Sequence, residues 1–338
     1  MNNISVMITG AAGSIGCEIA KQLCIANVKN LILCDIAESP LHQIALEIND
    51  THPNIKYSAI LADVRNKTVM RKIFEQYNPQ YIFHAAACKH VPLIEDNPCQ
   101  AVLTNISGTK TVADLAAEFN TECFVMISTD KAVNPGSVMG ASKRIAELYV
   151  QSLKGATRFI TTRFGNVIDS NGSVIPRFRE QIKRGGPLTV THRDVVRYFM
   201  TINEACRLVI KACEMGQGGE IFVFDMNEPV KIINLAEEMI RKAGYKPYKD
   251  IDIVITGLRA GEKLYEDILY KNETAENTMH NKIKVVKTNC ANTMTVPNMA
   301  LETLLANAEN GDNLATVKTM KEIIPEFKSC NSIYSSLD

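Results

Sequence analysis

Three consecutive residues, Thr129, Asp130 and Lys131, bring together a hydroxyl, a carboxylate and an amine. These groups can hold a substrate oxygen and can give and take protons, which is the work of general acid–base catalysis. They follow an apolar run, 123–127, that is typical of a buried strand. Nucleotide-binding sheets hold their ligands at this end of a strand. We therefore predict that all three are catalytic, and the structural alternative is an ion pair in a loop.

A glycine-rich turn, Gly10-Ala-Ala-Gly13-Ser-Ile-Gly16, connects an apolar strand at 4–9 to a helical pattern that runs to residue 23. In this context the first glycine makes a tight turn, the second admits a pyrophosphate to the backbone amides, and the third lets helix and strand pack closely. An ordinary tight turn is the alternative. The predicted dinucleotide-binding residues of this turn are Gly10, Gly13, Ser14, Ile15 and Gly16.

Asp35 ends a second strand, 31–34, about twenty residues after the glycine turn, where an acid can bind both hydroxyls of an adenine ribose. No arginine follows directly, which favours NAD over NADP as the cofactor. The alternative is that Asp35 caps the next helix. Further predicted cofactor contacts follow the third strand, 60–64, and the fourth, 81–84: Asp63, Val64, Ala85 and Ala86.

Met139 and Lys143 are four residues apart in a helical pattern that continues to residue 153, so they share one helix face. We place both in the catalytic set, with Lys143 also on the ribose of the nicotinamide. A thioether cannot transfer a proton, so Met139 would line the sugar pocket without reacting. For Met139, simple core packing is the structural alternative.

Basic residues in three loops are candidates for substrate binding. Lys89 and His90 follow the fourth strand, over the predicted site, although loop residues of these types are often only solvated. Arg259 stands in a glycine-framed loop, 257–263, which suits a diphosphate, and Arg197 precedes a helix. Surface ion pairing is the alternative for both arginines.

Composition excludes several classes of function. Lys plus Arg and Asp plus Glu both number 37 among 338 residues, so no basic excess indicates nucleic acid or an anionic membrane. The ten cysteines are scattered without zinc spacing, which predicts a reducing cytoplasm and no metal. The first strand begins near residue 4, and no apolar run approaches the ~18 residues of a spanning helix. We expect a cytoplasmic protein without a signal peptide or membrane segment.

Alternating strands and helices predict an α/β fold with a doubly wound parallel sheet. We expect an NAD-binding Rossmann domain at 1–165, with return segments near 195–225. Residues 166–338 would mainly form a smaller mixed α/β domain that binds the substrate. Beyond residue 274 the pattern indicates polar loops and two modest helices.

The motifs resemble the UDP-N-acetylglucosamine 4,6-dehydratase family of polysaccharide biosynthesis, within the extended short-chain dehydrogenase/reductase superfamily. Many members carry an N-terminal membrane region, and the last motif usually has proline where Ala260 stands. The matching segments are G-A-A-G-S-I-G (10–16), H-A-A-A-C-K-H-V-P (84–92), S-T-D-K-A-V-N-P (128–135), V-M-G-A-S-K-R (138–144), R-F-G-N-V (163–167), R-Y-F-M-T-I (197–202) and G-L-R-A-G-E-K-L-Y-E (257–266).

This resemblance implies tightly bound NAD and UDP-N-acetylglucosamine, or a close UDP-sugar, as substrate. The UDP part would be held by Asn166, Arg197, Arg259 and Glu262. A short-chain dehydrogenase usually has tyrosine where Met139 stands, so acid–base chemistry would move to residues 129–131. The implied product is a 4-keto-6-deoxy sugar, with retention at C5 favoured over inversion. The resemblance also implies a homo-oligomer, with the helix 141–153 in a two-helix interface.

Two other functions remain open at this point. A UDP-sugar 4-epimerase needs only the hydride step at C4, but such enzymes normally keep the tyrosine that Met139 replaces. A non-catalytic NAD-binding regulatory protein would explain the missing tyrosine, but not an intact Thr-Asp-Lys sequence beside a basic loop.

Overall fold

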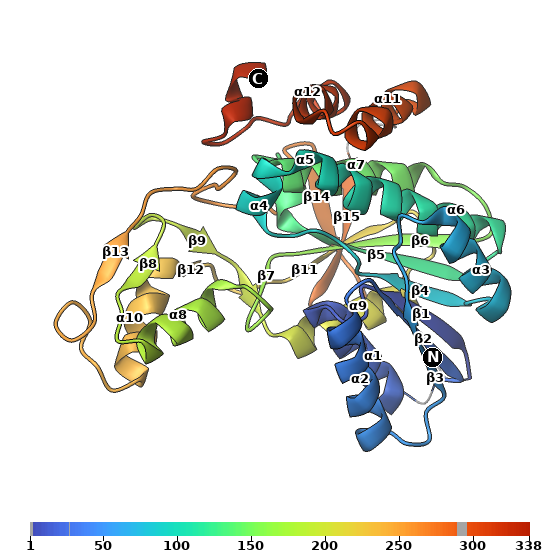
Figure 1. Ribbon diagram of the computed structural model, residues 1–338, viewed down its shortest axis with the longest axis horizontal. Coiled ribbons are helices and arrows are strands. Elements are labelled where there is room, and N and C mark those ends of the chain that lie inside the picture. Colours follow the sequence, from blue (N-terminus) through green and yellow to red (C-terminus); the bar gives the residue numbers. More distant parts are fainter. Residues whose placement is uncertain (1–2, 27, 289–295) are drawn as a thin grey trace.

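The computed structural model describes residues 3–26, 28–288 and 296–338. Within this part of the chain nine strands form one sheet, in the order β14-β15-β11-β6-β5-β4-β1-β2-β3 (Figure 1). The seven strands from β11 to β3 are parallel, and β15 and β14 extend the edge antiparallel. The predicted α/β fold with a doubly wound parallel sheet is confirmed. The strands are β1 Ser5–Thr9, β2 Asn30–Asp35, β3 Tyr57–Leu61, β4 Tyr81–His84, β5 Cys123–Thr129, β6 Arg158–Phe164, β11 Ile221–Phe224, β14 Glu273–Asn277 and β15 Ile283–Thr288.

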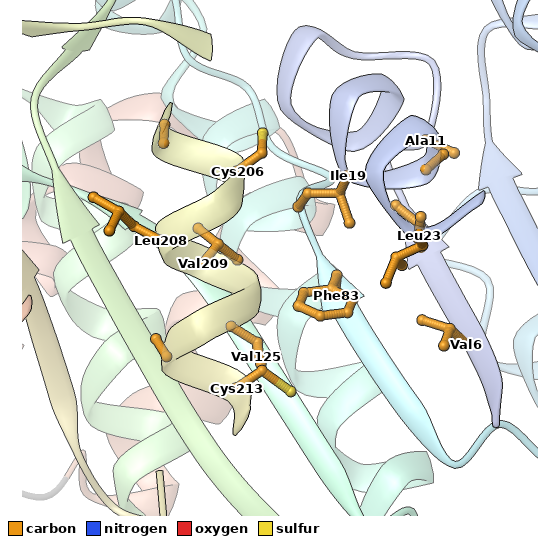
Figure 2. Packing of buried hydrophobic residues seen from close by; sticks show 14 of the residues in the cluster. Val6, Ala11, Ile19, Leu23, Phe83, Val125, Cys206, Leu208, Val209 and Cys213 are labelled. Atoms are coloured by element: carbon orange, nitrogen blue, oxygen red, sulfur yellow. The ribbon is translucent and has the colours of Figure 1, made fainter. Parts of the chain in front are cut away.

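Helices cover both faces of the sheet because successive strand residues point to opposite sides. Val6 and Ile8 belong to the core beneath α1, α2 and α9, and Figure 2 shows side chains of α1 and α9 gathered over the strands. Met7, between them, belongs to the core beneath α3, α6 and α7. The helices are α1 Ser14–Ile25, α2 Glu38–Thr51, α3 Lys67–Tyr77, α4 Val91–Asp96, α5 Pro98–Ala101, a π-helical turn Val102–Gly108, α6 Thr109–Glu118, α7 Val138–Ser152 and α9 Ile202–Met215.

A smaller lobe stands beside the carboxyl ends of the parallel strands and has its own core (Figure 1). Phe178 of α8 is fully buried there against residues of α10, β8 and β13. Three two-stranded ladders complete the lobe and its junction with the sheet. Its elements are α8 Val174–Lys183, α10 Ile232–Lys242, β7 Asn166–Val167, β8 Leu188–Val190, β9 Val196–Arg197, β10 Phe199–Met200, β12 Val230–Lys231 and β13 Ile253–Ile255.

The end of the chain does not lie where the predicted domain division, with 166–338 mainly in the smaller domain, would place it. Polar loops were expected after residue 274, but β14 and β15 join the large sheet. Edge strand β14 exposes most of its polar side chains, so it lacks the apolar alternation that marks a strand. Two helices, α11 Asn298–Glu309 and α12 Asn313–Ile323, then pack over α5 and α7. These parts of 166–338 therefore lie with the large sheet and not with the smaller lobe.

Helix α7 is covered by this C-terminal pair. Eleven of its fifteen residues are buried within the chain. Its apolar side chains, such as Ile145 and Leu148, share a core with Leu304 of α11 and Met320 of α12. The C-terminal helices of the chain itself therefore cover part of the helix that the resemblance assigns to a two-helix interface. In the described residues, no helix is long and apolar enough to cross a bilayer.

A buried ion network ties α7 to the sheet. Arg163 of β6 is 1% exposed and bonds Glu147 of α7 through Nε (2.9 Å) and Nη2 (2.8 Å). Its Nη1 donates to Glu273 of β14 at 2.8 Å. The Ser128 hydroxyl also donates to Glu147, at 2.6 Å. Burial raises the pKa of Glu147, but the charges and hydrogen bonds of Arg163 outweigh it and hold the pKa at about 2.

Replacing Arg163 by methionine should destabilise the fold strongly, because the buried Glu273 loses its cation and the buried Glu147 keeps only Arg144, at 3.2 Å. We expect a loss of about 3–5 kcal/mol in the free energy of unfolding, measured by urea denaturation. Arg184→Met, which removes an exposed pair with Glu180, is the matched control and should have almost no effect. Equal small effects for both variants would contradict a structural role for the network.

Candidate active site

A cavity of about 690 Å³ runs along the carboxyl ends of β1, β4 and β5 and continues under the smaller lobe. Its size suits a small-molecule ligand. The lining is basic: six lysines and arginines face it, against two carboxylates. Such a lining favours anionic ligands. The basic residues are Lys89, Lys131, Lys143, Arg177, Arg197 and Arg259, and the acidic residues are Glu262 and Glu266.

The glycine turn forms one wall of this cavity, with Gly10, Gly13, Ser14, Ile15 and Gly16 all in the lining. A Cβ on Gly10, whose φ is +68°, would lie 2.6 Å from the backbone nitrogen of Ala86. A Cβ on Gly16 would lie 2.2 Å from the Gly10 carbonyl oxygen. Gly13 caps α1 without a side-chain hydrogen bond to the first turn. The turn therefore leaves helix amides for an anion, as a dinucleotide pyrophosphate requires.

The other predicted cofactor residues lie in two groups. Ala85 lines the cavity, and the backbone of Ala86 packs against the glycine turn. The Asp35 carboxylate accepts hydrogen bonds from the amides of Ala12 and Ala37, both at 2.9 Å. It thus links the glycine turn to the residue before α2, but it does not cap that helix, whose N-cap residue is Ala37 and has no side-chain cap. Asp35 stands outside the cavity lining.

Asp63 and Val64 also lie outside the lining. The predicted third strand, 60–64, is wrong in its bounds, because β3 ends at Leu61. Asp63 instead forms an ion pair with Arg65, with 2.7 Å between Oδ2 and Nη2. Burial opposes ionisation, but the Arg65 hydrogen bonds lower the pKa of Asp63. Val64 is buried, and its side chain occupies the space in which a Cβ on Gly108 would stand.

Thr129, Asp130 and Lys131 form a hydrogen-bonded cluster where β5 ends in a short 3₁₀ turn. Oδ1 of Asp130 accepts from the Thr129 hydroxyl at 2.7 Å and from Nζ of Lys131 at 3.0 Å. Lys131 also donates to Oδ1 of Asn166, at 2.9 Å. Thr129, Lys131 and Asn166 line the cavity, as predicted.

Asp130 itself does not line the cavity. The residue is 3% exposed, and its Oδ2 is buried without a hydrogen-bond partner in the described part of the chain. This oxygen faces Gly165, where an added Cβ would lie 3.0 Å away. Asp130 therefore meets the cavity only through Thr129 and Lys131.

Met139 and Lys143 both face the cavity from α7, which confirms that they share a helix face. Lys143 is 5% exposed, and burial lowers its pKa to about 8, against the opposing charge of Glu147. His84 lies nearby and is buried between the hydroxyls of Thr9 (2.7 Å) and Thr109 (2.9 Å). Burial and the Lys143 charge lower its pKa to about 3, so it is neutral.

The predicted substrate residues meet on the far side of the cavity. Arg197 is buried and donates to the carbonyls of Val196, Lys263 and Leu264, which fixes the loop 257–264. Arg259 is half exposed and pairs with Glu262, at 2.9 Å from Nε to Oε1.

Lys89 and His90 also line the cavity, beside the start of α4. Their pKa values are lowered, mainly because the cavity wall restricts their hydration. The ring of His90 lies against Gly172, so the loop 170–173 closes over this end.

Glu266 is a site residue that the sequence interpretation missed. Its side chain lines the cavity, is 6% exposed, and lies 3.8 Å from Arg197. Burial raises its pKa, while the charge of Lys131 opposes the rise. Its position at the end of the glycine-framed segment 257–266 was the available signal. It adds a carboxyl group next to the Lys131 cluster.

The buried ammonium of Lys143 should make stability depend on pH. Its folded pKa is below its unfolded value, so the folded state disfavours the proton and the cost is fully present below about pH 8. Lys143→Met should therefore be more stable than the natural chain at pH 7, by up to about 3 kcal/mol. The advantage should shrink as pH rises toward the ordinary lysine value. Urea denaturation at pH 7 and pH 9.5 would measure it, and a pH-independent difference would contradict the expectation.

Comparison with known proteins places the chain in a family. The model described as "Polysaccharide biosynthesis protein" matches residues 6–288. The capsular polysaccharide biosynthesis protein CapD of Staphylococcus aureus is 50% identical over 84% of this chain and 48% of its own length. The X-ray structure of Pen from Bacillus thuringiensis has a TM-score of 0.79 and 33% identity, covering 86% of this chain and 90% of that one.

Two further relatives carry different names. A UDP-N-acetylglucosamine 4,6-dehydratase (inverting) of Campylobacter jejuni is 32% identical over 81% of this chain and 79% of its own length. A UDP-glucose 4-epimerase of Rickettsia rickettsii is 33% identical over 80% of this chain and 79% of its own length. The chain spans about half the length of CapD and of the Bacillus subtilis protein EpsC. With its motifs, cavity and fold in agreement, the chain belongs to the polysaccharide biosynthesis protein family, as the sequence resemblance predicted.

Proposed function

We propose that the chain is an NAD-dependent UDP-N-acetylglucosamine 4,6-dehydratase. The observation that carries the proposal is the Thr129–Asp130–Lys131 cluster, hydrogen-bonded within itself and to Asn166, on the wall of a basic cavity. This cluster offers a hydroxyl and an amine to one sugar ring, with the buried Asp130 carboxylate hydrogen-bonded behind both. Met139 stands on the same wall and cannot take part in proton transfer.

The residues present fit NAD. The glycine turn would hold the pyrophosphate, and Lys143, which faces the cavity, would hold the ribose of the nicotinamide. Asp35 accepts from the amide of Ala12 in the turn and would hold the adenine ribose. When bound, NAD would accept a hydride from C4 of the sugar and return it at C6.

The UDP half would lie under the smaller lobe. Arg259 is exposed enough to exchange its Glu262 partner for a diphosphate, and Arg197 would hold the loop that carries it. Lys89 would add positive charge to the cavity wall, and His90 beside it would offer an imidazole for hydrogen bonding. A UDP-sugar is therefore the proposed substrate class.

The first proton transfer would use Thr129. Its hydroxyl donates to Asp130 and accepts a long hydrogen bond from the Lys131 amide, at 3.4 Å, so one lone pair is left to accept from the C4 hydroxyl. As the hydride leaves C4, the hydroxyl proton would pass to Thr129 and the Thr129 proton to Asp130. Thr129 and Asp130 together would do the work of the tyrosine that usually stands at the position of Met139. In this step Asp130 would become a carboxylic acid.

The 4-ketone then acidifies the C5 hydrogen. The Lys131 amine would take that proton, while Asp130 gives its proton back through Thr129 to the leaving C6 hydroxyl, which departs as water. After the hydride reaches C6, the Lys131 ammonium would return a proton to C5. Each group ends as it began, and the substrate has lost one water. Since the same amine takes and returns the proton on one face, we propose retention at C5.

Lys131→Met should abolish turnover without loss of the cofactor, because only the base is removed. We expect product formation to fall by about 10³-fold or more, measured by mass spectrometry as a sugar nucleotide lighter by one water. NAD released from the denatured protein should be unchanged in amount. The exposed Lys154→Met is the matched control and should keep full activity.

The similarity to a UDP-glucose 4-epimerase makes epimerisation the second candidate reaction. A product of unchanged mass that is inverted at C4 would replace the dehydratase proposal with a UDP-sugar 4-epimerase. No product from any sugar nucleotide, with NAD bound, would favour the regulatory NAD-binding protein.

A further inference from the structure

The last residues of the chain lie against the loops that frame the cavity. Phe327 and Tyr334 are 1% and 4% exposed and anchor this segment in the core beneath α11 and α12. The residues between them, 328–332, form what we call the C-terminal strap. The strap follows residue 288, where the family match ends, so no family motif accounts for it.

The strap joins two loops through backbone hydrogen bonds. The amide of Lys328 donates to the Pro135 carbonyl at 3.2 Å, and the amide of Cys330 donates to the Gly136 carbonyl at 2.9 Å. On its other side, the Cys330 carbonyl accepts from the amide of Gly261 at 2.7 Å. Residues 135–136 follow the catalytic turn, and Gly261 stands between Arg259 and Glu262. The strap therefore connects the catalytic turn to the predicted diphosphate loop.

A buried carboxylate completes the connection. Glu95 of α4 is 3% exposed and accepts from the Ser332 hydroxyl and from the amide of Val138, the first residue of α7, both at 2.7 Å. Gly261, with φ at +75°, packs so closely that a Cβ would lie 2.9 Å from Oε1 of Glu95. Four segments thus meet at one point: α4, the start of α7, the loop 257–263 and the strap.

We infer that the C-terminal strap positions the loop that carries Arg259 and Glu262, and thereby sets the affinity of the site for the UDP half of its substrate. The contacts are to backbone groups and to Glu95, so the strap adds no reacting group to the cavity. Its loss should weaken nucleotide binding and leave the proton-transfer cluster in place. The identity of the ligand rests on the proposed function, but the positioning of the loop does not.

Hydrogen exchange tests the positioning without any ligand. Deletion of 328–338 should speed exchange of the Gly261 amide by roughly tenfold, because its acceptor is lost. Ser332→Ala should give a smaller increase. Ser336→Ala is the matched control, since its hydroxyl contacts only Ile333, and it should leave exchange unchanged. Unchanged exchange at Gly261 in the deletion variant would overturn the inference.

Calorimetry with UDP and with NAD then tests the consequence. In the deletion variant we expect affinity for UDP to fall about tenfold and affinity for NAD to stay within about twofold. The KM for the sugar nucleotide should rise more than kcat falls. An equal loss of both affinities would indicate a merely structural role and would overturn the inference. If the natural chain binds no UDP, the proposed substrate is wrong, and the Gly261 exchange still decides the role of the strap.

Discussion

The site depends on the buried contact between Arg163 and Glu147. This pair fixes α7, which carries Met139 and Lys143, against the part of the sheet that ends in the turn 129–131. Glu147 also accepts from Ser128, the residue directly before Thr129. Because all the carboxylate's contacts are satisfied and almost no water reaches them, α7 and the end of β5 have one arrangement relative to each other.

The charged groups of the site fall into two sets, one held in fixed positions and one that can change its partners. Lys131 and Thr129 are held by Asp130 at one oxygen, so the groups that we propose to react are placed before any ligand arrives. Arg259, by contrast, pairs with Glu262 at a half-exposed position where exchange for a phosphate costs little. The proposed transfer of several protons around one sugar ring requires groups in fixed positions, as in the Asp130 cluster. Entry of an anionic nucleotide requires a cation that can exchange its partner, as Arg259 can.

Local sequence patterns predicted most of the large sheet and the main walls of the cavity. The glycine turn, the polar residues after β5 and the Met139–Lys143 pair are each specified within a few residues, so their placement followed from local motifs and spacing. The edge strand β14 was missed because its pairing with β15, and not its composition, makes it a strand. The direction of Asp130, the cavity position of Glu266 and the strap depend on residues far apart in the chain, such as Gly165, Arg197 and Gly261. Such contacts leave no periodic signal.

The most direct test is proton NMR of the purified protein with UDP-N-acetylglucosamine in deuterated water, without added NAD. The account predicts a new 6-methyl signal and deuterium at C5 in the original configuration, because the Lys131 amine exchanges its hydrogens with solvent before it returns one. A product with inverted C5 would keep the dehydratase and reject the one-base mechanism. A spectrum that stays unchanged after addition of NAD and other sugar nucleotides would contradict the account as a whole.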